Sequence, residues 1–193
     1  TVFLYAFRER ELILDLFEEY CGARLTYNSQ RIGGLPLDVP PGWDRKVLEF
    51  CDIMDSKVDE YETLLTHNRI WLERTRDIGI ISGSEAVALG MCGPALRGSG
   101  VPRDVRKDEP YAAYDEVEFD VPIGDRGDTY DRYLVRLEEF RQSTRIIRQG
   151  IEGLPEGPFI GKVPRLIKPP AGETYHAIES PKGEIGFFIV SDG

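Results

Sequence analysis

Apolar residues recur at intervals of three and four along three long stretches of the chain, which predicts three amphipathic helices. The first stretch covers residues 1–20, and Gly22 is predicted to end it. It carries two apolar stripes, so we expect this helix to have neighbours on more than one side. The stripes are Phe3, Phe7, Leu14 and Phe17, with Arg10 in register, and Val2, Ala6, Ile13 and Leu16. No capping residue precedes the pattern, so we expect the natural helix to begin earlier.

The second helix is predicted to begin near Trp43 and the third to span residues 128–151. The apolar seam of the second helix consists of Val47, Phe50, Met54, Val58, Tyr61 and Leu65. The seam of the third consists of Tyr133, Leu137, Phe140, Thr144, Ile147 and Ile151, and its reverse face carries Arg132, Glu139 and Arg145. Asp125 or Asp128 is expected to satisfy the free amides at its start.

Glycine and proline interrupt the pattern in three further regions. Residues 28–42 are therefore predicted to be irregular, and residues 70–122 to hold only short helical pieces, such as 84–89 with Ser84 as N-cap. A connecting region of that length in a compact protein is more often functional than idle. After Pro155 a Pro/Gly-rich link leads to two predicted strands, 174–178 and 184–190, with a turn at residues 181–183.

These patterns predict a mainly α protein with a small β element, an α+β fold class. We expect one domain that is truncated at both ends. Residues 1–154 form its helical portion and include a long irregular region at 66–124. Residues 155–193 form a linker and a small β-hairpin.

Charge and composition exclude several classes of function. The net charge of the 193 residues is -10, which disfavours a nucleic-acid binder because phosphate neutralisation requires basic surfaces. The longest apolar runs, such as 187–190, are too short to span a bilayer, so any membrane contact is expected through partner subunits. Cys21, Cys51 and Cys92 form no CxxC pair, which favours a reducing compartment over a disulfide scaffold.

Residue types that carry catalytic or metal chemistry give weak signals. His67 and His176 are the only histidines and neither has metal-ligand spacing around it, so no bound metal is predicted. The glycine-rich stretch at residues 90–100 lacks the Gly-Lys-Ser/Thr of a phosphate-binding loop. Tight turns are the favoured interpretation there.

Basic residues in irregular backbone give a stronger signal. They are Arg31, Arg97, Arg103, Arg106 and Lys107. A guanidinium group on a rigid loop binds carboxylates, and it also raises the potential of a nearby redox centre by stabilising the reduced state. Ordinary solvated charge is the alternative. Because Tyr111 and Tyr114 add amphipathic rings, we expect a site or an interface in this region.

Several long motifs in order resemble the D subunit family of the NADH:quinone oxidoreductases, or respiratory complex I. They are Asn68-Arg69-Ile70-Trp71, Leu96-Arg97-Gly98-Ser99-Gly100, Asp104-Val105-Arg106-Lys107, Phe119-Asp120-Val121-Pro122-Ile123-Gly124, Asp131-Arg132-Tyr133-Leu134-Val135-Arg136 and Ser180-Pro181-Lys182-Gly183-Glu184. The family shares ancestry with the large subunit of [NiFe] hydrogenases, so the resemblance implies a fragment of that helical bundle. It also implies a pocket for quinone, the substrate, where the hydrogenase metal site used to be.

The resemblance further implies cofactors and partners that lie outside this segment. A [4Fe-4S] cluster belongs to the partner small subunit, NADH and FMN act elsewhere in the complex, and this segment binds no cofactor. Expected partners are that small subunit, the C subunit and the membrane-arm subunit of the quinone channel. The expected location is peripheral to the bacterial inner membrane on the cytoplasmic side, or on the matrix side in an organelle. The family's quinone-binding His and Tyr lie upstream, so no catalytic residue is expected here.

Two groups of residues match family positions of interest. Arg31, Gly33 and Gly34 match an arginine loop near the terminal cluster, and Thr26 stands where the family commonly has a histidine that titrates with the cluster. Arg97, Asp104, Arg106, Lys107 and Tyr111 match positions near the subunit interface. The link between residues 156 and 174 is shorter than in many relatives, which carry a helix-containing insert.

Two other functions stay open at this point. One is the large subunit of a membrane-bound complex related to [NiFe] hydrogenases, whose metal-binding cysteine pairs would lie outside this segment. The other is a scaffold segment without a direct catalytic role.

Overall fold

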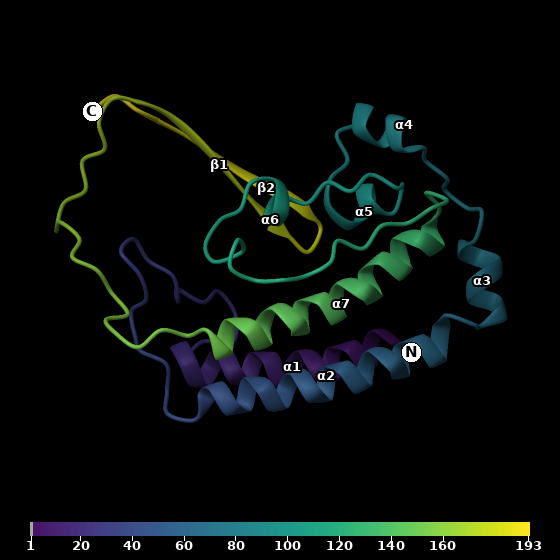
Figure 1. Ribbon diagram of the computed structural model, residues 1–193, viewed down its shortest axis with the longest axis horizontal. Coiled ribbons are helices and arrows are strands. Elements are labelled where there is room, and N and C mark those ends of the chain that lie inside the picture. Colours follow the sequence, from purple (N-terminus) through teal and green to yellow (C-terminus); the bar gives the residue numbers. More distant parts are fainter. Residues whose placement is uncertain (1) are drawn as a thin grey trace.

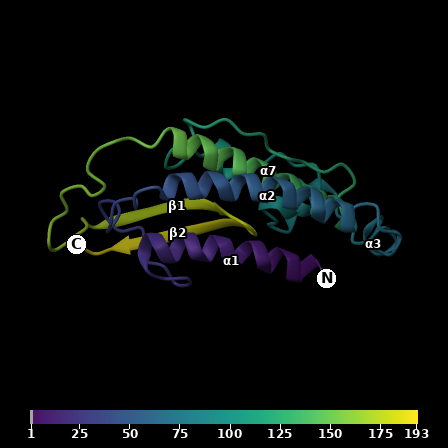
Figure 2. The same cartoon turned by 90° about the horizontal axis from the view of Figure 1, so that it is seen from below.

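Three long helices lie side by side and form the body of the computed structural model, which describes residues 2–193 (Figure 1). They are α1 (Val2–Cys21), α2 (Trp43–Leu65) and α7 (Thr129–Glu152). Helix α2 packs against both others, and the view from below shows it between α7 and α1 (Figure 2). The three predicted helices are therefore confirmed. Of the two residues proposed to cap α7, Asp128 does so, because its carboxylate accepts the Asp131 amide.

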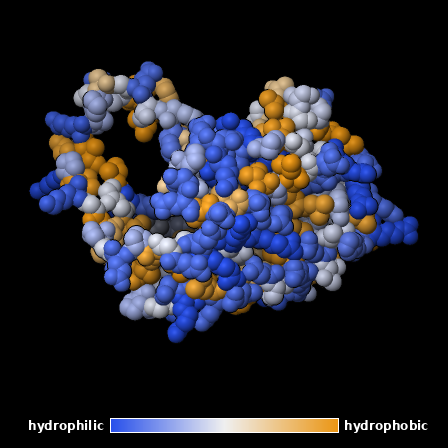
Figure 3. Space-filling view, viewed as in Figure 1, coloured by the Kyte–Doolittle hydropathy of each residue, from blue (hydrophilic) through white to orange (hydrophobic). Residues whose placement is uncertain are grey.

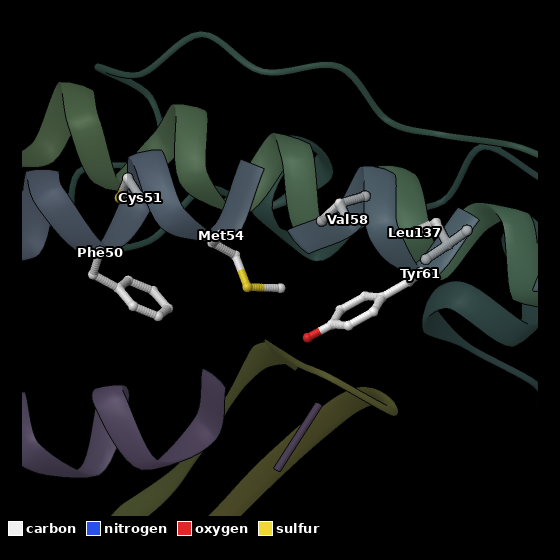
Figure 4. Packing of buried hydrophobic residues seen from close by; sticks show 6 residues of the cluster. All are labelled: Phe50, Cys51, Met54, Val58, Tyr61 and Leu137. Atoms are coloured by element: carbon white, nitrogen blue, oxygen red, sulfur yellow. The ribbon is translucent and has the colours of Figure 1, made fainter. Parts of the chain in front are cut away.

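The core lies on the two sides of α2. Phe50, Met54 and Tyr61 point from α2 toward α1, where they meet apolar residues of one stripe of that helix (Figure 4). Leu137 of α7 closes the other side. The residues of α1 that pack against this cluster are Val2, Tyr5, Ile13 and Leu16. Of the two predicted stripes of α1, the one containing Ile13 thus faces this cluster. In the other stripe Leu14 is buried, at 5% exposed, whereas Phe3 is 69% exposed.

Four short helices connect α2 to α7. They are α3 (Arg69–Thr75), α4 (Gly83–Ala88), α5 (Gly93–Arg97) and α6 (Val105–Asp108). The predicted N-cap of α4, Ser84, is wrong, because Ser82 is the cap. Ser82 has an extended backbone and stands three residues before Glu85, so the two side chains satisfy each other's backbone amides in a capping box.

The two predicted strands are confirmed and are longer than expected. β1 (Gly172–Ser180) and β2 (Gly183–Ser191) pair antiparallel, with Gly172 opposite Ser191 and Ser180 opposite Gly183. The sequence therefore forms a mainly α structure with a small two-stranded sheet, as predicted. None of the helices in residues 2–193 is long and apolar enough to cross a lipid bilayer.

The hairpin is fastened at its turn and extends away from the helices toward its open end (Figure 1). At the turn, a Cβ added to Gly93 would lie 2.3 Å from the Cα of Gly183, so only glycine permits this approach. Residues 153–171 form the linker from α7 back to the open end. Apolar residues gather on this linker in the space-filling view (Figure 3), where Leu166 is 69% exposed.

Candidate functional site

Arg31 stands at the first position of a tight turn in the segment between α1 and α2. Its amide donates to the carbonyl of Gly34 at 2.9 Å, and the amide of Gly34 donates back to the carbonyl of Arg31 at 3.0 Å. Gly33 and Gly34 have φ angles of 96° and 136°, which residues with a side chain rarely adopt. The turn therefore depends on these two glycines.

Backbone hydrogen bonds from the linker, residues 153–171, hold this turn. The amide of Gly161 donates to the carbonyl of Gly33 at 2.7 Å, and the amide of Leu35 donates to the carbonyl of Phe159 at 2.9 Å. A Cβ added to Gly34 would lie 2.4 Å from the oxygen of Phe159, closer than real contacts allow. Backbone from two distant parts of the sequence thus holds the base of the turn in place.

The turn presents an arginine without a carboxylate partner. Arg24, in the same segment, donates to three acidic side chains of α1, which raise the pKa of its guanidinium. Arg31, in contrast, is exposed and forms no ion pair within residues 2–193. Thr26 is also exposed and has a left-handed backbone (φ 54°), with its hydroxyl donating to the carbonyl of Leu25.

A second group lies in the interior between α5, α6, α7 and the hairpin, and we call it the Arg97 cluster. Its members are Arg97, Asp104, Arg106, Glu139 and Glu179. Arg97 is 1% exposed and donates to Glu139 at 2.8 Å and to Glu179 at 3.0 Å. Arg106 donates through Nε and Nη2 to the two oxygens of Asp104, at 2.9 and 2.6 Å, and also to Glu139 at 3.0 Å.

Burial and pairing set the charges of this cluster. Burial alone would raise the pKa of Asp104, but the hydrogen bonds and charge of Arg106 outweigh it and the net shift is downward. Burial raises the pKa of Glu179, and Arg97 opposes this shift only in part. The fold therefore stabilises the ionised form of Asp104 and disfavours that of Glu179.

The residues predicted for the subunit interface differ in their exposure to solvent. Arg97, Asp104 and Arg106 are buried inside the chain, whereas Lys107 is exposed, with its Nζ 4.1 Å from the centroid of the Phe119 ring. The hydroxyl of Tyr111 accepts the amide of Glu179 at 3.1 Å, which ties the hairpin to the α6 region. Their role at an interface stays a prediction.

The sequence reasoning missed Glu139 and Glu179 as members of this cluster. The apolar pattern of α7 predicts Glu139 on the face opposite the seam and indicates no partner for it. Glu179 lies at the end of a strand, 82 residues from Arg97, and no sequence pattern signals that contact.

The Arg31 turn and the Arg97 cluster are separate sites. No hydrogen bond or ion pair joins them among the described residues. Within residues 2–193, no group of three or more His, Cys, Asp or Glu side chains is arranged to hold a metal ion. Cys21, Cys51 and Cys92 are unpaired thiols. The chain thus offers, at Arg31, an exposed guanidinium without an ion pair on a fixed turn, and elsewhere a buried network of ion pairs.

Comparison with known proteins decides the family. The profile of "Respiratory-chain NADH dehydrogenase, 49 Kd subunit" matches residues 1–170 and 162–193. This chain belongs to that family. It is 52% identical over its whole length to the D 2 subunit of the NADH-quinone oxidoreductase of Solibacter usitatus, covering 52% of that protein. It is 49% identical to the D subunit of the Bacillus mycoides enzyme over 99% of its length, covering 52% of that protein.

This chain of the 49 kDa subunit family spans about half the length of the curated relatives that it matches. The D 2 subunit of Thermodesulfovibrio yellowstonii is 51% identical, and its alignment runs over 222 positions for the 193 residues of this chain. That relative therefore has additional residues within the aligned region. The family match divides at residues 162–170, in the linker, which supports the expected position of an insert between residues 156 and 174.

Proposed function

We propose that this chain is part of a core peripheral-arm subunit of a proton-translocating NADH:quinone oxidoreductase, and that it helps to form the quinone-reduction site. Family membership over the whole chain supports the enzyme, and the names of the relatives favour it over a hydrogenase-related complex. Electrons from NADH enter through FMN elsewhere in the complex. The subunit is peripheral to the membrane, on the cytoplasmic side in bacteria or the matrix side in an organelle.

The Arg31 turn is the observation that carries the role at the quinone site. An exposed guanidinium without an in-chain partner, on a turn braced from behind, suits a neighbouring anionic group. We assign that neighbour as the [4Fe-4S] cluster of the partner small subunit, with the C subunit and the quinone-channel subunit as further partners. A fixed positive charge there stabilises the reduced cluster, whose charge is more negative, and raises its midpoint potential.

Substitution of Arg31 in the assembled enzyme tests this proposal. Arg31→Ala is expected to lower quinone reduction by roughly tenfold, equivalent to about 1.4 kcal/mol of barrier, and to shift the midpoint potential of the cluster downward. Arg31→Lys keeps the charge and retains part of the activity. Electron transfer from NADH to an artificial acceptor upstream of the cluster reports assembly and stays unchanged.

Arg69→Ala is the matched control, because the Arg69 side chain is 90% exposed and pairs only with Glu73 on its own helix. It is expected to leave both activities at wild-type level. Wild-type quinone reduction and an unchanged potential in Arg31→Ala would favour the scaffold interpretation instead.

Thr26 supports a second test of the same assignment. A threonine does not titrate near neutral pH, so we expect the cluster potential in this enzyme to depend only weakly on pH. Thr26→His is expected to introduce a pH-dependent potential between about pH 5 and 8, measured by redox titration. A steep pH dependence in the wild type, unchanged in Thr26→His, contradicts the assignment.

A further inference from the structure

A cavity of about 400 Å³ lies between α7 and the turn of the hairpin, next to the Arg97 cluster. One wall is a single face of α7, where helical spacing aligns Arg136, Glu139, Phe140 and Ser143. Arg97 and Pro181 belong to the facing wall. Charged groups beside apolar surfaces, in a cavity of this size, are typical of sites that bind small molecules or single side chains.

One arginine at this cavity has no carboxylate partner. The guanidinium groups of Arg97, Arg106 and Arg136 belong to its lining. Three carboxylates, those of Asp104, Glu139 and Glu179, lie beside Arg97 and Arg106. The carboxylates are engaged by Arg97 and Arg106. Arg136 instead donates to the backbone carbonyl of Arg132 at 2.7 Å, and it forms no ion pair in the described part of the chain.

Two donor groups at the cavity, the guanidinium of Arg136 and the Nε–H of Arg97, therefore lack an anionic acceptor. The pKa of Arg136 is lowered by burial and then by repulsion from the charges of Arg132 and Arg97, so its cationic form is destabilised where it stands. The Nε–H of Arg97 is buried and has no acceptor. Buried donors almost always have a partner, and the exposed guanidinium of Arg136 is free to pair with an anion that enters the cavity.

We propose that this cavity binds one carboxylate group, with Arg136 as its principal ligand. A planar guanidinium matches a carboxylate in two parallel hydrogen bonds. The apolar part of the ligand lies against Phe140 and Pro181, which line the cavity. The carboxylate belongs either to an acidic side chain of a neighbouring polypeptide or to a small organic acid.

The first arm of the test detects a neighbouring polypeptide. In Arg136→Lys, the lysine amine can be joined to a carboxylate in contact by a zero-length carbodiimide, applied to the protein purified with its bound subunits. The expected product is a cross-link from position 136 to an acidic residue of another chain, identified by mass spectrometry. Arg145→Lys is the matched control on the same helix, because Arg145 pairs with Asp120 at 2.9 Å and must give an in-chain product.

The second arm detects a small acid. Phenylglyoxal labelling of wild-type Arg136 is followed by mass spectrometry, with succinate as the probe ligand and exposed Arg69 as the internal control. If a free acid is the ligand, succinate at about ten times its dissociation constant slows labelling of Arg136 roughly tenfold. Labelling of Arg69 is expected not to change.

A positive result in either arm supports the proposal and identifies the source of the carboxylate. No interchain cross-link at position 136, together with labelling of Arg136 that succinate leaves unchanged, overturns it. Neither arm measures quinone reduction, so the outcome is independent of the proposed function.

Discussion

Replacement of Arg97 by methionine tests how strongly the buried cluster stabilises the fold. The side chain is 1% exposed, and Arg97→Met leaves Glu179 without a hydrogen-bonded cation, whereas Glu139 keeps Arg106. Removal of one partner of a buried ion pair typically costs about 3–5 kcal/mol, because the remaining charge stays buried without compensation. That is a large share of the roughly 5–15 kcal/mol by which a domain is stable.

Urea unfolding followed by circular dichroism and tryptophan fluorescence measures this loss. For a denaturant slope of about 2.5 kcal/mol/M, a loss of about 4 kcal/mol lowers the midpoint by roughly 1.6 M. The double variant Arg97→Met/Glu179→Gln should recover part of the loss, since it removes the uncompensated charge as well. Arg69→Met is the control on the surface and should not shift the midpoint.

Two results would refute this reasoning. One is a loss below about 1 kcal/mol in Arg97→Met, the range of an exposed ion pair. The other is a double variant that loses as much stability as the sum of the two single variants, because the two sites would then be energetically independent.

Three smaller predictions follow from local geometry. Ser82→Ala should destabilise the chain by about 1 kcal/mol in thermal unfolding, and Ser84→Ala by almost nothing, because only Ser82 caps α4. Gly34→Ala should speed proteolysis of the linker, because the added Cβ clashes with the carbonyl oxygen of Phe159 and the turn no longer holds the linker. Gly42→Ala is the control: it adds backbone strain without a clash and should leave the cleavage rate unchanged. The pKa of Glu179 is raised by burial, so its contribution to stability is complete below its ordinary pKa of 4.5 and declines as pH rises. The free energy of unfolding of the wild type, measured with urea and taken relative to that of Glu179→Gln, should therefore be smaller at pH 7.5 than at pH 5.

The long helices could be predicted from the sequence because burial follows their period. The seam of α2, from Val47 to Tyr61, is buried as expected, since one regular face supplies most of the core. Phe140, which was assigned to the seam of α7, is 42% exposed and lines the cavity near the hairpin. Helix α7 has neighbours on two sides, so a single apolar stripe could not describe it.

The site could be predicted only where one short segment carries all the necessary information. The Arg31 turn needs two left-handed residues in a row, and the pair Gly33–Gly34 supplies them within the segment itself. The Arg97 cluster depends instead on α5, α7 and β1 meeting in space. The brace of residues 159–163 behind the turn is equally long-range, and neither contact has a local pattern.

Because α7 and the hairpin turn are anchored separately, the linker between them can vary in length within this family. The linker of 19 residues, 153–171, connects elements that are each fixed to the body independently. The 222-position alignment contains 29 more positions than this chain. A linker longer by that number of residues would raise the entropic free-energy cost of loop closure by only about 0.8 kcal/mol. Homologues can thus gain or lose a surface module at this point while the buried ion pairs and the strand register stay intact.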